Sequence, residues 1–197
     1  MKWWNRLFGK KKSDRPDKSP YLPNEKVPRE IGFAQNFTEK GGFFLYYENQ
    51  KQIKDNFLQI LRENGWNRED VLCFDQNLAA VFDLPLTKQE DKISSFKVGL
   101  LLCEYLISNT GSILFCHHQI QHLKMNQLPK TLVVYASLNQ FVSDVSEGMT
   151  KLKNKYNKKI PTNISAINCQ DNKQVDGDSS STNPSKNIYL LLQDDSF

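Results

Sequence analysis

The sequence predicts an α/β protein with a mostly parallel β-sheet and helices on both faces. Short apolar runs alternate along the chain with stretches whose apolar residues recur at helical spacing. The apolar runs are nearly continuous, as in strands that are buried on both faces. The 197 residues, 39% of them hydrophobic and 12 of them Phe, suffice for one domain with a sizeable core.

A first strand–helix unit is expected in residues 42–65. Gly42–Tyr47 (GFFLYY) is aromatic and strand-like. Asn49 can cap a helix that runs to about Asn64, where Gly65 supplies the stop. One face of this helix collects the apolar residues Ile53, Phe57, Ile60 and Leu61.

Four further strands are expected between residues 71 and 136. Val71–Asp75 (VLCFD) predicts a short buried strand, and Leu78–Phe82 predicts a helical turn or two after it. Gly99–Ile107 and Ser112–Cys116 predict strands on either side of a small polar loop. Thr131–Ala136 (TLVVYA) predicts another buried strand.

A long helix and two strands complete the predicted order. Ser137 and Gln140 have the spacing of a capping box, which predicts a helix from Ser137 to about Tyr156. Its apolar stripe consists of Phe141, Val145, Met149, Leu152 and Tyr156. Ile164–Asn168 and Asn187–Gln193 (NIYLLLQ) predict the last strands, but the order of the strands in the sheet stays open.

Residues 1–30 are predicted to form a basic amphipathic tail and a proline-rich linker, ahead of a domain at 31–197. On a helix, one face of the tail would consist of Trp3, Trp4, Leu7 and Phe8. Three lysines follow, a pattern that suits peripheral membrane contact of residues 1–12, docking on a protein, or a tail without fixed structure. Because no stretch resembles a secretory signal or a membrane span, we expect a cytoplasmic protein, at most peripheral to a membrane.

Charge and cysteine usage argue against several functional classes. The whole chain has a net charge of +4. Residues 1–18 alone carry +5, so the rest of the chain carries −1, which argues against a nucleic-acid-binding surface.

The four cysteines are widely spaced and form no CxxC pair, so we expect buried free thiols rather than a zinc ribbon. Iron–sulfur clusters would therefore belong to redox partner proteins. No GxGxxG or Walker loop is present, and no cofactor is predicted.

The polar loop Asn109-Thr110-Gly111-Ser112 separates two apolar runs and is the first candidate for a binding site. Successive backbone N–H groups around a glycine can form a nest for an anion, and the two hydroxyls can add donors. At the carboxyl end of a strand, such a loop would suit a carboxylate, a phosphate or an acyl oxyanion. The alternative is a plain turn, because Asn, Gly and Ser are common turn residues.

Glu104 and the histidines are weaker candidates for chemistry. A buried Glu104 needs a partner, so it is expected in an ion pair with a lysine such as Lys186, or else as a catalytic acid or base. Asn109 is neutral and cannot serve as a carboxylate nucleophile. His118 and His122 would face the same way on a helix, as metal ligands do, but solvated side chains on a loop rim are the alternative.

Gly99–Leu114 (GLLLCEYLISNTGSIL) resembles the signature of the LUD-domain family, the lactate-utilisation C proteins. In that family an apolar strand is followed by Thr-Gly-Thr or Thr-Gly-Ser and a second strand, and the similarity extends from about Gly41 to the end of the chain. The resemblance implies a fold of the sugar-phosphate isomerase and CoA-transferase type. It also implies an association with oxidation of lactate or another organic acid.

The sequence departs from the family pattern near its end, as a shortened branch would. Family members carry a Gly-Pro-Ser-x-Thr-Ala-Asp-Ile-Glu segment, whose place is taken here by residues 179–189 without the acidic part. By the resemblance, Ser181 and Lys186 of this segment are expected at the ligand. Three functions stay open: an accessory protein that binds a small organic anion, an isomerase or acyltransferase, and an interaction protein anchored by its tail.

Overall fold

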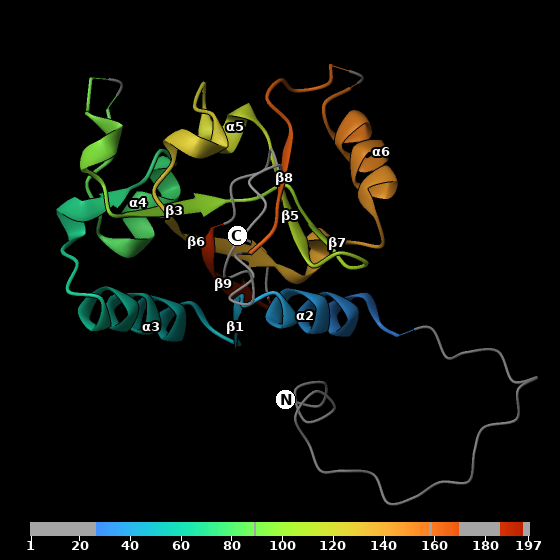
Figure 1. Cartoon of the computed structure of the whole chain (residues 1–197), viewed down its shortest axis with the longest axis horizontal. Coiled ribbons are helices and arrows are strands. Elements are labelled where there is room, and N and C mark those ends of the chain that lie inside the picture. Colours follow the sequence, from blue (N-terminus) through green and yellow to red (C-terminus); the bar gives the residue numbers. More distant parts are fainter. Residues whose placement is uncertain (1–26, 89, 158, 170–185, 195–197) are drawn as a thin grey trace, which may run out of the picture.

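A parallel sheet of five strands forms the centre of the molecule (Figure 1). The computed structural model describes residues 27–88, 90–157, 159–169 and 186–194. All neighbouring strands of this sheet run parallel, as the apolar pattern predicts. In spatial order the strands are β1 (Phe43–Tyr47), β9 (Asn187–Gln193), β6 (Thr131–Ser137), β3 (Val98–Leu102) and β2 (Val71–Leu72).

A second, smaller sheet packs against one face of the first. Its strands are, in spatial order, β7 (Phe141–Val142), β4 (Tyr105–Ile107), β5 (Ser112–Phe115) and β8 (Ser165–Ile167). The prediction of one strand over Gly99–Ile107 is wrong, because the chain leaves the first sheet after Leu102 and enters the second at Tyr105. At the junction, the N–H of Glu104 donates to the carbonyl of Leu114 over 2.8 Å, so the chain begins to pair with β5 at this residue.

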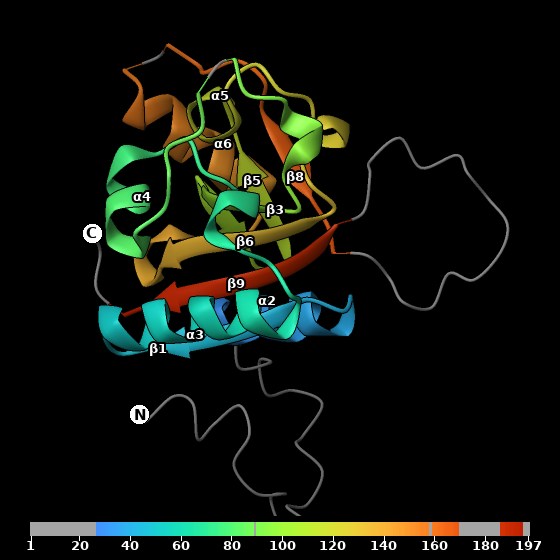
Figure 2. The same cartoon turned by 90° about the vertical axis from the view of Figure 1, so that its left-hand side faces the viewer.

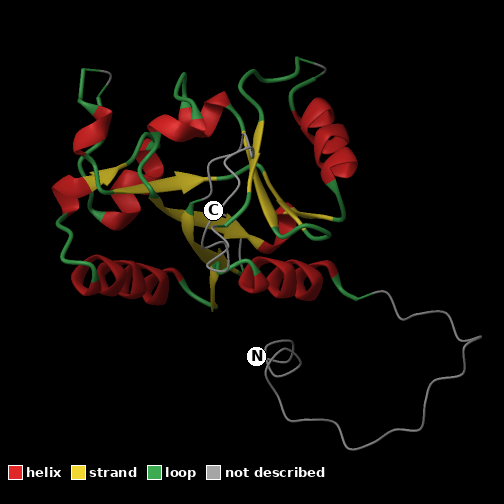
Figure 3. Ribbon diagram, viewed as in Figure 1, coloured by secondary structure: helices red, strands yellow, loops and turns green. Residues whose placement is uncertain are grey.

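The helices and the small sheet cover both faces of the large sheet (Figures 2 and 3). Helices α3 (Gln50–Glu63) and α4 (Gln76–Phe82) pack on one face. Helices α2 (Arg29–Glu39) and α5 (His117–Ile120) pack on the other, together with the small sheet. The last helix, α6 (Val145–Lys155), covers the outer face of the small sheet.

The side chains of β6 show why its apolar run is continuous. Val133 and Tyr135 join the core beneath α3 and α4. Leu132 and Val134 point to the opposite face and join the core beneath α2 and the small sheet. Since successive side chains of a strand alternate between faces, a strand buried on both faces needs apolar residues at every position.

Most of the predicted elements before residue 137 are confirmed. The Asn49 side chain accepts a hydrogen bond from the N–H of Gln52 over 3.0 Å, so it caps α3 as predicted, and Asn64 ends that helix. The helix expected after the Val71 strand is also present, with the Asp75 carboxylate as its cap. The sequence interpretation missed α2 altogether.

The long helix predicted from Ser137 is wrong. The capping box is present, but it closes a single 3₁₀ turn, Leu138–Gln140, at the end of β6. Phe141 and Val142 then pair with β4 instead of entering a helix. Helix α6 begins only after Asp144, whose carboxylate accepts a hydrogen bond from the N–H of Glu147. Strand pairing therefore overrides a correct local signal.

Several predicted residues lie outside the described part of the chain, namely Trp3, Trp4, Leu7, Phe8 and Ser181. The roles expected of them stay predictions. Helix α2 begins at Arg29, inside the segment predicted to be a linker. Within the described residues, no helix is long and apolar enough to cross a membrane.

Candidate functional site

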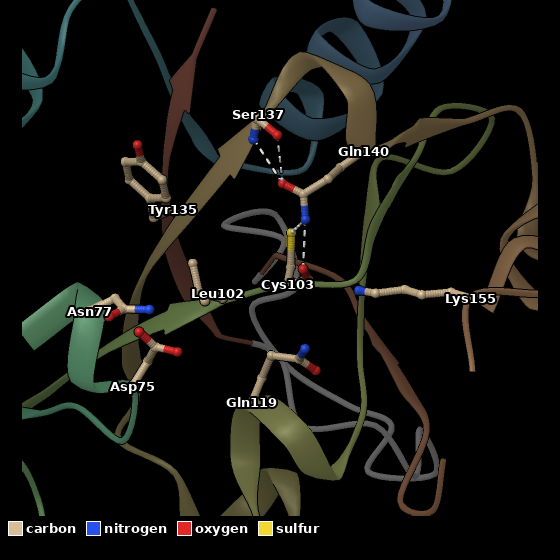
Figure 4. A pocket seen from close by; sticks show the side chains of 9 residues that line it. All are labelled: Asp75, Asn77, Leu102, Cys103, Gln119, Tyr135, Ser137, Gln140 and Lys155. Atoms are coloured by element: carbon tan, nitrogen blue, oxygen red, sulfur yellow. Dashed lines mark hydrogen bonds between the residues drawn. The ribbon is translucent and has the colours of Figure 1, made fainter. Parts of the chain in front are cut away.

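A cavity of about 260 Å³ lies at the carboxyl edge of the large sheet (Figure 4). Strands β2, β3 and β6 end there, which is where open parallel sheets bind ligands. Five separate segments of the chain contribute the side chains. They are Asp75, Asn77, Leu102, Cys103, Gln119, Tyr135, Ser137, Gln140 and Lys155.

The cavity has polar groups of opposite kind at its two sides. Figure 4 shows Asp75 and Asn77 on one side and Lys155 on the other, with Leu102 and Cys103 between them. One oxygen of the Asp75 carboxylate accepts a hydrogen bond from the N–H of Leu78 over 2.8 Å. No described residue forms a hydrogen bond with the Asn77 side chain, so its amide is available to a ligand.

Gln140 fixes the wall of the cavity where β6 ends. Its Oε1 accepts a hydrogen bond from the N–H of Ser137 over 2.8 Å. Its Nε2 donates to the carbonyl of Cys103 over 2.6 Å. This single side chain therefore ties the turn after β6 to the point where the chain changes sheets. On the same strand, the Tyr135 hydroxyl donates to Gln193, and burial raises the pKa of Tyr135 to about 12.

Glu104 lies behind the cavity with a fully buried side chain. Its Oε2 accepts a hydrogen bond from the Lys155 ammonium over 2.8 Å. Its Oε1 accepts from the amide of Gln119 over 2.8 Å and from the hydroxyl of Tyr156 over 2.7 Å. The thiol of Cys116 adds a donor at 3.2 Å from the same oxygen. The carboxylate thus has four donors and belongs to a structural ion pair.

Burial alone would raise the pKa of Glu104, but the hydrogen bonds from Lys155, Gln119, Tyr156 and Cys116 outweigh it and lower that pKa. A carboxylate held in its ionised form is a poor general acid. The ion pair expected of Glu104 with a lysine is confirmed, but its partner is Lys155 and not Lys186, the example that the sequence suggested. The buried ammonium of Lys186 donates instead to the carbonyl of Leu128 over 2.8 Å.

The Asn109–Ser112 loop forms a tight turn between β4 and β5. Two backbone N–H groups of this loop already donate within the protein, that of Asn109 to Ser143 and that of Gly111 to Ile107, and the N–H of the preceding Ser108 donates to Val142. These groups are not available to an anion, so the geometry favours the turn over the nest. Binding of a ligand to the side chains of this loop stays a prediction.

The side chains of the turn also bond to neighbouring elements. The hydroxyls of Thr110 and Ser112 lie 2.6 Å apart, and that of Ser112 donates to the Asn168 side chain over 2.8 Å. The ammonium of Lys40, just past the end of α2, donates to the carbonyl of Thr110 over 2.6 Å. The Asn36 amide of α2 donates to the carbonyl of Ser108 over 2.8 Å. The turn is thereby fastened to α2.

The turn needs a glycine at position 111. Its φ is +63°, in the left-handed region. A Cβ at this position would lie 2.5 Å from the backbone nitrogen of Phe37 and 2.6 Å from the carbonyl carbon of Asn36. The close approach of the turn to the backbone of α2 therefore requires a residue without a side chain.

His118 and His122 do not face the same way on one helix, and both side chains are exposed, as in the alternative that the sequence left open. Helix α5 ends at Ile120, and Gln121 follows with a φ of +52°, so His122 lies beyond the helix. The structure instead brings His118 together with His117 and Cys116.

All four cysteines are buried free thiols, as expected from their spacing.

None of the residues that line the cavity was expected at a ligand. Asp75, Asn77, Gln119 and Lys155 come from regions that carry no motif, and Gln140 was expected only in a capping box. Asp75 and Asn77 directly follow a predicted strand, which is the one signal that could have suggested them. Lys186 does not line this cavity.

Comparison with known proteins assigns the chain to a family. The LUD domain model matches residues 32–193. The crystal structure of a DUF162 family protein from Deinococcus radiodurans is similar to this chain, with a TM-score of 0.59 and 15% identity over 85% of this chain and 99% of that chain. A search of the curated proteins found no match. Because the family model spans most of the sequence, including both sheets and the cavity, the chain belongs to the LUD domain family.

Proposed function

We propose that this protein binds a small hydroxylated organic acid, such as lactate, in the cavity at the carboxyl edge of the large sheet. We further propose that it acts as an accessory component in the oxidation of such acids. The observation that carries the proposal is the opposite chemistry of the two sides of the cavity, with Asp75 facing Lys155 across it.

The charges of the cavity favour a ligand with both a carboxylate and a hydroxyl. A simple anion would meet the Lys155 ammonium but also the Asp75 carboxylate, which would repel it. A 2-hydroxy acid avoids this conflict, because its hydroxyl can donate to Asp75 and accept from Asn77 on one side while its carboxylate accepts from Lys155 on the other. Leu102 offers an apolar contact between the two sides for a short alkyl group.

An accessory role is better supported than catalysis. An acyl transfer of the covalent kind needs a free carboxylate nucleophile, and Glu104 is buried and bonded to four donors. Asp75 is the remaining carboxylate at the cavity, and one of its oxygens caps α4. Oxidation of a hydroxy acid also needs an electron acceptor, which we assign to iron–sulfur or other redox partner proteins.

A thermal-shift screen of the full chain tests the proposal. The panel holds lactate, other 2-hydroxy acids, pyruvate, sugar phosphates and acyl-CoA. A ligand at about 100 times its Kd should stabilise the protein by about 2.7 kcal/mol. We expect lactate or a related hydroxy acid to give the largest shift, and pyruvate, which lacks the hydroxyl, to give a smaller one.

Two sets of variants separate the cavity from the turn. Asn77→Ala and Lys155→Gln change the two sides of the cavity and should abolish the shift. The matched control, Thr110→Val with Ser112→Ala, changes the turn and should leave the shift intact. A shift lost only in the control would move the ligand to the turn, and a panel without any shift would contradict the proposal.

A further inference from the structure

Two imidazoles and a thiol meet at the start of α5, beside the cavity. Donor atoms of Cys116, His117 and His118 all lie within 4.8 Å of one another. Cys116 is the extended residue that precedes α5, with a φ of −139° and a ψ of −176°. The change from strand to helix at this point brings three consecutive side chains together, although consecutive residues of a regular helix point in different directions.

Neighbouring segments hold the two rings beside each other. The centroids of the His117 and His118 rings are 3.9 Å apart. His118 also stacks on Tyr156, with the centroids 4.8 Å apart and an angle of 14° between the planes. The Nδ1 of His117 accepts a hydrogen bond from the N–H of Thr162 over 3.2 Å. Thr162 is exposed, so its N–H could bond to water if a metal took its place at Nδ1.

We propose that Cys116, His117 and His118 form a binding site for Zn²⁺ or a similar divalent transition metal. Thiolate and imidazole are the donors that such ions prefer, whereas Mg²⁺ and Ca²⁺ take oxygen ligands. Donors at about 2.0–2.3 Å from one tetrahedral ion lie about 3.3–3.8 Å apart. His118 is exposed, so a rotation of its side chain can close the remaining gap.

Three protein donors leave a fourth position for water or another ligand, as in zinc sites that are not purely structural. A second cavity, of about 120 Å³, adjoins the cluster and is lined in part by His118 and Gln119. It shares Asp75, Leu102 and Gln119 with the larger cavity. The metal would therefore border the candidate ligand site, but its binding does not depend on the hydroxy acid.

Metal binding replaces the proton of the Cys116 thiol. In the free protein Cys116 is a buried thiol that donates a hydrogen bond to the Glu104 carboxylate over 3.2 Å. On binding, the metal–sulfur bond forms, the proton leaves to the solvent, and the charge of the ion compensates the thiolate beside Glu104. The Glu104 carboxylate keeps its other three donors, Lys155, Gln119 and Tyr156.

Titration with Co²⁺ tests the site in the full chain after treatment with a chelator. We expect saturation at one Co²⁺ per chain, visible bands of tetrahedral cobalt, and a thiolate-to-cobalt charge-transfer band in the near ultraviolet. Zn²⁺ should displace the cobalt and abolish these bands. His118→Ala should weaken binding at least about 100-fold, because loss of even an outer partner of a metal ligand costs about 10–100-fold.

His122→Ala is the matched control, since it removes the one remaining histidine of the chain and should leave binding unchanged. Cys116→Ser should abolish the charge-transfer band, and circular dichroism should show that it folds. His118 is exposed, so His118→Ala tests the site even if the Cys116 variant fails to fold. The proposal is overturned if no saturable band appears, or if the band survives in His118→Ala.

Discussion

The segment Cys103–Ser112 contains two polar regions with different environments. At its start, Cys103 and Glu104 lie where the chain leaves the large sheet, at or directly behind the cavity. At its end, Asn109–Ser112 lies against α2, and three backbone N–H groups around it are already bonded. The Thr-Gly-Ser pattern predicts a ligand loop, yet the cavity lies at the other end of the segment, where Cys103 lines it.

The difference shows that the neighbours of a polar loop decide its role. The turn has the residue types of an anion site, but the N–H groups of Asn109 and Gly111 already donate to Ser143 and Ile107. The cavity lies outside the Asn109–Ser112 loop, but the Asn77 amide and the ends of three parallel strands face it. We therefore expect substitutions in the turn to change stability without changing binding, and substitution of Asn77 in the cavity to change binding without changing stability.

The largest effect should come from removing the buried carboxylate at the start of the segment. Glu104→Ala leaves the four donors without their acceptor and should lower the free energy of unfolding by about 4 kcal/mol in urea denaturation. Asp83→Asn is the control, because Asp83 pairs with Lys54 at the surface and has a φ of 52°, which Asn tolerates. The control should show no measurable change, and equal stability of the two variants would contradict a structural role of Glu104.

At the other end of the segment, Gly111→Ala should lower the free energy of unfolding by about 3 kcal/mol. The added Cβ would overlap the backbone of α2 at Phe37 as well as strain the left-handed φ. Gly65→Ala is a matched control, since Gly65 has a φ of +65° with nothing within 4 Å of the added Cβ. It should cost only about 1 kcal/mol. If the two variants are equally stable, the turn is not packed against α2 as described.

Acidification should reduce the stability that Glu104 contributes, by less than the substitutions above. The folded state lowers the pKa of Glu104 below its ordinary value of 4.5. Stability from its ionised form is therefore complete above pH 4.5 and is lost as the pH falls through the folded pKa. Comparison of the wild type with Glu104→Gln, from neutral pH down to about 3, should show the difference in free energy of unfolding shrinking. A constant difference would mean that Glu104 is not held ionised.

The smallest effect concerns the hydrogen bond between α2 and the turn. Asn36→Ala removes the donor to the carbonyl of Ser108 and should cost about 1 kcal/mol. Asn56→Ala removes a bond to Gln52 within the exposed surface of α3 and should be neutral or slightly stabilising, because Ala favours helices. A cost for Asn36→Ala no larger than for Asn56→Ala would show that the turn does not depend on this bond.

Much of the fold could be predicted from local patterns. Asn49 and Gly65 correctly mark the two ends of α3. The continuous apolar runs at Thr131–Ala136 and Asn187–Gln193 are strands of the large sheet, as predicted. Helix α2 also has a local signal that went unused, since Phe33 and Phe37 lie one turn apart on its buried face.

The sheet change at Cys103–Glu104 and the short strand β7 could not be predicted in this way. No Gly or Pro interrupts the run from Leu100 to Ile107, and the break depends on pairing with β5 and β7, which are formed by later residues. The partners of Glu104 are likewise distant in sequence, with Lys155 and Tyr156 at the end of α6. The cavity collects residues from five segments, so its composition follows only from the complete fold.

The most direct test of the central claim is a map of backbone amide shifts on addition of the hydroxy acid that stabilises the protein most. A chain of 22.8 kDa is accessible to nuclear magnetic resonance. We expect the largest changes to cluster at Asp75–Asn77, Cys103, Gln119 and Ser137–Gln140, which surround the cavity. Changes concentrated at Asn109–Ser112, with the cavity residues unaffected, would contradict it.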